Sequence, residues 1–191
     1  MNLPIALTLF RIVVVPLIVV FVISSDRVWV LIAAVIFVAA SLTDWLDGRL
    51  ARRRNQVTRF GTLLDPVADK LLVAAALIAL LQVEMIGAWI AVVIIGRELA
   101  VTGMRGVALS MGVVVPASNL GKLKTVSQYV AITILILERG VPPEFVPFHL
   151  VSVGALWVAV GLTVVSGAAY FYRFFLKAGP RAIIKNEERW P

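Results

Sequence analysis

The sequence predicts an all-α integral membrane protein with six transmembrane helices. Of the 191 residues, 61% are hydrophobic and only 15% are charged, whereas soluble domains are nearer half apolar. Several apolar runs are long enough to cross a bilayer, which takes about 20 residues, and the basic residues gather beside one set of their ends. We expect spans at about 5–25, 28–48, 62–83, 85–108, 120–138 and 146–172.

Turn-forming or charged residues separate these spans. The first span has no small-residue cleavage site before Asp26, so we interpret it as a retained helix and not as a signal peptide. The expected breaks are Ser24–Arg27, the arginine-rich stretch 49–59, Gln82–Glu84, Pro116–Asn119 and Glu138–Glu144. We expect one catalytic domain over 1–175, followed by a polar cytoplasmic tail over 176–191.

The basic residues predict the orientation. Six spans place both termini and the loops after spans 2 and 4 on one side of the membrane. Among the loop and flanking cations only Arg27 and Arg139 fall on the other side. Because loops rich in Lys and Arg stay inside, we expect a multi-pass protein of the inner (cytoplasmic) membrane with both termini in the cytoplasm.

Composition excludes several kinds of site. The chain has no cysteine, and its one histidine is His149, so thiolate metal sites, disulfides and histidine-rich zinc sites are excluded. The net charge is +7. In so apolar a chain this charge favours anionic membrane lipids over nucleic acid as the partner.

Four aspartates stand where an apolar span is expected, namely Asp44, Asp47, Asp65 and Asp69. An aspartate at the centre of a membrane helix costs about 2.5–3.5 kcal/mol, so four deep, unpaired ones would cost on the order of 10–14 kcal/mol. That exceeds the net stability of a typical domain. Shallow depth, cationic partners or metal ions must offset the cost.

The spacing of the aspartates favours metal ions. Asp44 and Asp47 are three residues apart and Asp65 and Asp69 are four apart, so each pair shares a helix face. A basic cytoplasmic connection makes the two helices an antiparallel hairpin whose pairs can face each other. Oxygen ligands alone suit Mg²⁺ or Mn²⁺, and four carboxylates can bridge two such ions. The alternatives are solvated helix ends and ion pairs with Arg52–Arg54.

The same stretch carries a motif that resembles the signature of the CDP-alcohol phosphatidyltransferases. It reads Asp44-x2-Asp47-Gly48-x2-Ala51-Arg52-x8-Gly61-x3-Asp65-x3-Asp69, with eight fixed residues across 26 positions. Other stretches are similar to the bacterial phosphatidylglycerophosphate synthases of that family. They are Asn2-Leu3-Pro4, Leu7 to Arg11, Gly96 to Leu99 with Arg105, and Gly121 to Gln128. One departure is Ile5, where those proteins have Asn.

The resemblance implies a six-helix fold, a homodimer and a polar cavity that faces the cytoplasm. It also implies that CDP-diacylglycerol donates its phosphatidyl group to glycerol 3-phosphate, giving phosphatidylglycerophosphate and CMP in phospholipid biosynthesis. Small residues in the last span, at Gly154, Gly161 and Gly167, fit either a dimer contact or packing within one chain.

On this interpretation the residues of the motif and the cations of the fourth and fifth spans have expected roles. The metal ligands are Asp44, Asp47, Asp65 and Asp69, and Asp69 is also the candidate general base. Gly48, Ala51 and Gly61 form the wall beside the cytidine, with Arg52 on the nucleotide or on an aspartate. The acceptor phosphate calls for cations, for which we expect Arg105, Lys122, Lys124 and Arg97. Alternatively, Lys122 and Lys124 only set topology, and Arg97 forms an ion pair with Glu98.

Other functions compete with this hypothesis. Sister enzymes use serine, inositol phosphate or a lipid alcohol as the acceptor. Intramembrane carboxylates also bind cations in transporters, but such a path needs charges across the whole bilayer, and here they gather on one side. A scaffold that keeps the fold without catalysis would not need all eight motif residues.

Overall fold

A computed structural model describes residues 3–54, 59–111, 119–142 and 148–187. Side chains are described over 10–43, 67–111, 119–142 and 149–176. All six elements in these ranges are helices, and no strand occurs among the described residues. They are α1 (Leu3–Ile23), α2 (Arg27–Arg54), α3 (Arg59–Gln82), α4 (Ala88–Ser110), α5 (Asn119–Gly140) and α6 (Phe148–Glu187).

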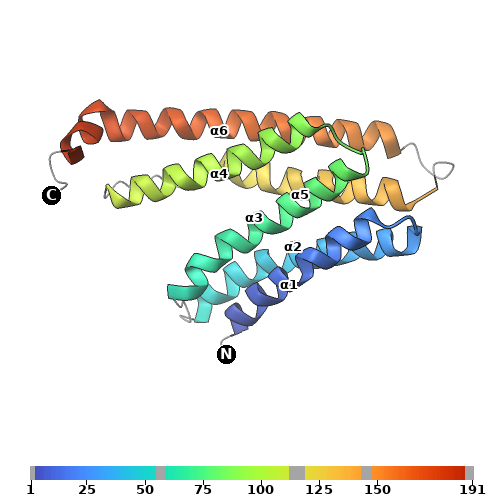
Figure 1. The fold of residues 1–191 in the computed structure, drawn as a ribbon. Helices are drawn as coiled ribbons and strands as arrows, with labels where there is room; N and C mark the ends of the chain where they lie inside the picture. Colours follow the sequence, from blue (N-terminus) through green and yellow to red (C-terminus); the bar gives the residue numbers. More distant parts are fainter. Residues whose placement is uncertain (1–2, 55–58, 112–118, 143–147, 188–191) are drawn as a thin grey trace.

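The helices form an elongated bundle that opens towards one end (Figure 1). The start of α1, the end of α2, the start of α3 and the end of α6 lie towards that end (Figure 1). Helix α1 packs on α2 and α3, α5 packs on α2 and α6, and α4 packs mainly on α6. The lower group α1–α3 and the upper group α4–α6 therefore meet chiefly through α5.

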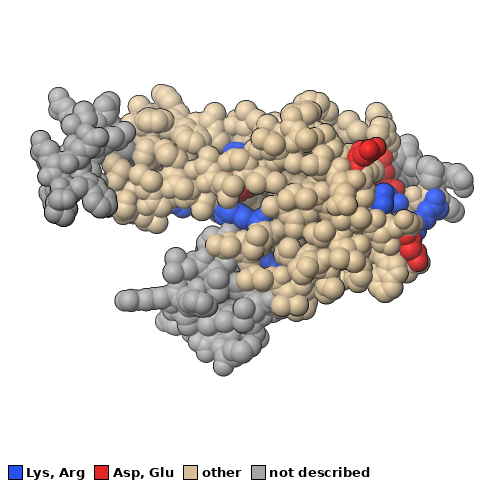
Figure 2. Space-filling view, viewed as in Figure 1, with Lys and Arg blue, Asp and Glu red and all other residues tan. Residues whose placement is uncertain are grey.

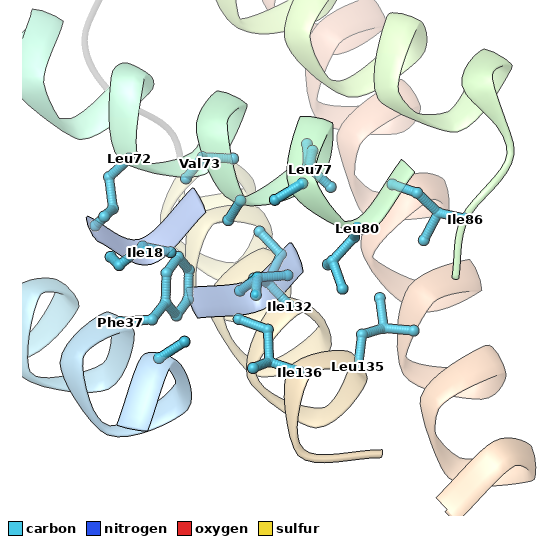
Figure 3. Packing of buried hydrophobic residues seen from close by; sticks show 14 of the residues in the cluster. Ile18, Phe37, Leu72, Val73, Leu77, Leu80, Ile86, Ile132, Leu135 and Ile136 are labelled. Carbon is cyan, nitrogen blue, oxygen red and sulfur yellow. The ribbon is translucent and has the colours of Figure 1, made fainter. Parts of the chain in front are cut away.

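The core lies towards the closed end of the bundle. Ile18 of α1, Phe37 of α2 and Leu72 of α3 are almost fully buried, and Ile132 of α5 joins them (Figure 3). These residues recur with a helical period on their own helices, as in Ile18 and Val22. Interdigitated aliphatic side chains of this kind fix how the helices sit against one another.

The outer faces of the helices are apolar. Val13, Val35, Val92 and Leu150 are all more than 60% exposed, an arrangement that suits lipid and not water. Two of the described helical stretches, Asn119–Gly140 and His149–Leu176, are long and apolar enough to cross a membrane. Six helices are confirmed, and the crossing of the membrane by all six stays a prediction.

Each of the six expected spans overlaps one helix, but the helix ends differ from the expected bounds. Helix α2 continues to Arg54 and α6 continues to Glu187. Apolar length predicts where a chain is inside the bilayer, whereas a helix continues into water as long as its residues favour it. The domain boundary at 175 falls inside α6 and stays a prediction.

Candidate functional site

A cavity of about 1090 Å³ lies between α2, α3, α4, α5 and α6. Its described lining carries two carboxylates, Asp69 and Glu98, and more cations than carboxylates. Figure 2 shows Lys and Arg side chains gathered where the surface is hollowed, midway along the molecule. The cations of the lining are Lys70, Arg97, Arg105, Lys122 and Lys124. The cavity thus suits a ligand that carries negative charge.

Asp69 stands on the α3 wall of the cavity and is partly buried. The hydroxyl of Tyr129, on α5, donates a hydrogen bond to its Oδ1 atom. The Tyr129 ring packs edge-on against Phe37 of α2, with the ring centroids 6.0 Å apart. Three helices therefore hold one carboxylate in place at the cavity.

Two of the expected phosphate-binding cations are paired with one carboxylate. Glu98 Oε1 accepts from Arg97 Nη1 at 3.0 Å and from Lys124 Nζ. Lys124 is only 2% exposed. The Arg97–Glu98 ion pair that the sequence offered as an alternative is therefore present, and Lys124 joins it.

This ion cluster is tied to α6. Arg97 Nη2 donates to Ser166 Oγ at 3.0 Å, and a Cβ built on Gly167 would lie 3.1 Å from Arg97 Cγ. One turn away, Gln128 Nε2 donates to Thr163 Oγ1 at 2.9 Å. Polar contacts between membrane helices stabilise their association, so Arg97 and Lys124 brace α4, α5 and α6.

The other two expected cations, Arg105 and Lys122, are exposed and line the cavity. Neither has a carboxylate partner within the described part of the chain. The Arg105 guanidinium lies 5.8 Å from the ring centroid of Tyr170 on α6, a cation–π distance. These two side chains are therefore the cavity cations best placed to take an anionic ligand.

The remaining predicted site residues lie outside the side chains that the structure describes. The backbone of each is helical, and α2 and α3 contact each other and run in opposite directions (Figure 1), as the predicted hairpin requires. The convergence of the carboxylates and the cytidine wall stay predictions. The residues are Asp44, Asp47, Asp65, Gly48, Ala51, Arg52 and Gly61.

Comparison with known proteins decides the family. The sequence model of the CDP-alcohol phosphatidyltransferase family matches residues 1–165. The chain belongs to the CDP-alcohol phosphatidyltransferase family. This places it among membrane enzymes, in agreement with its apolar helices.

Individual family members are similar over most of their length. A Bacillus subtilis CDP-diacylglycerol–glycerol-3-phosphate 3-phosphatidyltransferase is 47% identical, over 89% of this chain and 93% of its own. An enzyme of the same name from Rickettsia typhi is 40% identical, over 89% and 95%. A probable phosphatidylglycerophosphate synthase from Mycobacterium tuberculosis is 40% identical, over 90% and 81%.

The donor set of this CDP-alcohol phosphatidyltransferase fits a hard divalent cation. Asp69 presents carboxylate oxygens at a polar cavity, and three further aspartates follow the motif on α2 and α3. Carboxylates without thiolate or imidazole favour Mg²⁺ or Mn²⁺. Arg97 and Lys124 form ion pairs with Glu98, so these two cations do not neutralise the aspartates that would bind the metal.

Two aromatic site residues were not predicted from the sequence. Tyr129 and Tyr170 both line the cavity. A buried tyrosine hydroxyl in an apolar helix needs a partner, and that signal marks both positions. It does not say which helix supplies the partner, because that depends on the packing of the bundle.

Proposed function

We propose that this chain transfers the phosphatidyl group of CDP-diacylglycerol to glycerol 3-phosphate, with two divalent cations held by Asp44, Asp47, Asp65 and Asp69. The observation that carries the proposal is the cavity, which brings Asp69 together with the exposed cations Arg105 and Lys122. A carboxylate near the metals and cations for an acceptor phosphate are what this transfer requires. The names of the relatives state the same reaction.

The reaction is a displacement at phosphorus. An acceptor hydroxyl forms a new P–O bond to the phosphatidyl phosphorus, the bond from that phosphorus to the CMP oxygen breaks, and CMP leaves with the electron pair. When bound, the divalent cations supply neutralisation of the diphosphate and of the charge that develops on the leaving group. Direct displacement is the order that we prefer over a covalent intermediate.

The chain itself supplies binding, orientation and proton transfer. Asp69 takes the proton of the acceptor hydroxyl, for which a positioned carboxylate at hydrogen-bond distance suffices. Arg105 and Lys122 bind the acceptor phosphate. Arg97 and Lys124, paired with Glu98, brace the helices that carry the site. Gly48, Ala51 and Gly61 leave space for the cytidine, and Arg52 contacts the nucleotide or an aspartate.

The membrane setting follows from the same arrangement. Lys70, Arg105 and Lys122 line the cavity and are among the cations that the positive-inside rule assigns to the cytoplasmic side, where the polar groups of both substrates are available. We infer an inner-membrane enzyme with cytoplasmic termini and, by family resemblance, a homodimer. Cross-linking in native membranes and the labelling of each terminus would test the two points.

An acceptor panel tests the function. The purified enzyme is given CDP-diacylglycerol with glycerol 3-phosphate, serine or inositol phosphate, and CMP and the lipid product are measured with and without a chelator. Of the three acceptors, we expect only glycerol 3-phosphate to give a lipid product, phosphatidylglycerophosphate. We expect no product after chelation. A product with another acceptor would contradict the acceptor assignment, and metal-independent CMP release would contradict the metal assignment.

A further inference from the structure

Tyr170 has a buried hydroxyl for which the described residues provide no hydrogen-bond partner. The residue lies on α6, is 9% exposed and lines the cavity. Leaving a buried donor without a partner is unfavourable, and such groups in native proteins are rare. A ligand that enters the cavity and displaces the atoms that cover this hydroxyl can supply the missing acceptor.

The ring of the same residue contacts the cation that is best placed for the acceptor. Arg105 stacks over Tyr170 at 5.8 Å from the ring centroid. A cation–π contact restrains the guanidinium without neutralising it, so its donors remain available to an anion. A carboxylate partner would also have restrained Arg105, but it would have neutralised the positive charge of the guanidinium.

The position of Tyr170 on α6 connects it to the bracing cluster. Ser166 lies one turn before Tyr170 on the same helix face and accepts from Arg97. Val101, Ala108, Tyr170 and Phe174 form a small buried cluster between α4 and α6. This packing holds the tyrosine ring against the helix that carries Arg105.

We infer that Tyr170 is a specificity-determining residue for the acceptor: its ring holds Arg105 at the cavity and its hydroxyl donates to the acceptor's phosphate. The inference rests on the proposed function. The hydroxyl gains its partner only in the complex, and the free enzyme is less stable for it. Removing the hydroxyl therefore affects acceptor affinity and protein stability in opposite directions.

The test compares Tyr170→Phe, Tyr170→Leu and Tyr172→Phe in the full-length enzyme in detergent. Tyr172 lies on the same helix, is 68% exposed and is absent from the cavity lining, so it is the matched control. The measurements are kcat, KM for glycerol 3-phosphate, KM for CDP-diacylglycerol and the melting temperature. Binding of glycerol 3-phosphate alone is followed by calorimetry.

For Tyr170→Phe we expect KM for glycerol 3-phosphate to rise about tenfold, with kcat and KM for CDP-diacylglycerol within about twofold. The melting temperature should rise by about 2–4 °C, because an unsatisfied donor is removed. Tyr170→Leu should raise the acceptor KM further, since the cation–π contact is lost as well. Tyr172→Phe should change none of these quantities.

An unchanged acceptor KM in Tyr170→Phe would overturn the hydroxyl contact, and an unchanged one in Tyr170→Leu would overturn the role of the ring. A fall in the melting temperature of Tyr170→Phe would also count against the inference, because it would show a hydroxyl that is satisfied in the free protein. If the unmodified enzyme makes no product from glycerol 3-phosphate, the proposed function fails instead, and the two failures are distinguishable.

Discussion

Tyr129 on α5 donates a hydrogen bond to Oδ1 of Asp69 on α3, across sixty positions of sequence. A carboxylate has two oxygens and about four sites at which it accepts hydrogen bonds. The tyrosine hydroxyl takes one of them and limits rotation of the group. Because Phe37 supports the Tyr129 ring, the carboxylate is held from α2 and α5 as well as from its own helix.

Tyr129→Phe should slow turnover while leaving substrate binding almost unchanged. The variant keeps the ring and its contact with Phe37 but no longer orients Asp69, and misplaced catalytic groups cost rate. We expect kcat to fall about tenfold, with both KM values within about twofold. Steady-state kinetics in detergent would check this, with Tyr172→Phe as the control. A wild-type kcat would show that the bond only braces the helices.

Asp69→Asn should abolish turnover and keep much of the binding of CDP-diacylglycerol. The amide cannot take a proton from the acceptor hydroxyl, whereas the other three aspartates of the motif remain. Removing a general base costs about 10²–10⁴-fold in rate. CMP release and equilibrium binding of the CDP-lipid would be measured on the same preparation. Near-normal turnover would disprove the assignment of Asp69 as the base.

The Glu98 cluster predicts unequal costs for removing its members. Glu98→Gln leaves the buried Lys124 and the partly buried Arg97 without their carboxylate, and an uncompensated buried charge costs about 3–5 kcal/mol. Lys124→Met leaves Glu98 paired with Arg97, so its cost should be smaller. Thermal unfolding of the two variants in detergent would rank them.

Steady-state kinetics of Lys124→Met distinguish the two roles considered for Lys124, which are bracing the helices and binding the acceptor phosphate. If it only braces the helices, Lys124→Met leaves KM for glycerol 3-phosphate within about twofold of the wild type. A large rise in that KM, with little loss of stability, would return Lys124 to the acceptor site.

The sequence predicts the six helices because bilayer thickness fixes the length of an apolar run. It also predicts the α2–α3 hairpin and the place of Asp69 at a polar cavity. Local spacing is enough for these features, since residues three or four apart share a helix face. The helix ends differ, as at Glu187, because hydropathy does not mark where a helix stops in water.

The partners of the polar residues could not be predicted, because they depend on how distant helices pack. Arg11 illustrates this: the sequence counts it with the cations of the cytoplasmic side, yet it lies well inside α1 and is only 1% exposed. Lys122 and Lys124 look equivalent in the sequence, but one is exposed and the other is buried against Glu98. Two residues along a helix turn a side chain by about 200°, so only the packing separates them.

Gly167→Val should loosen the junction of α4 and α6. A Cβ at this position would already lie 3.1 Å from Arg97 Cγ, and the branches of valine would push Arg97 away from Ser166. Overpacking of this kind costs about 1–3 kcal/mol. The matched control is Gly106→Val on α4, where a Cβ meets nothing within 4 Å. Equal melting temperatures for the two variants would contradict the tight fit.

Glu84→Gly should stabilise the protein through the turn that ends α3. Glu84 has a φ of 60°, and the bonds Met85 N–H to Leu80 O and Glu84 N–H to Leu81 O form a Schellman motif. Glycine avoids the left-handed penalty of about 1–2 kcal/mol but loses more chain entropy on folding, about 0.5–1 kcal/mol. The difference favours glycine by about 0.5–1 kcal/mol. Glu84→Ala keeps the strained backbone and serves as the control, so only the glycine variant should raise the melting temperature. A rise in both would instead point to an unfavourable contact of the Glu84 side chain, and a fall in Glu84→Gly to a favourable one.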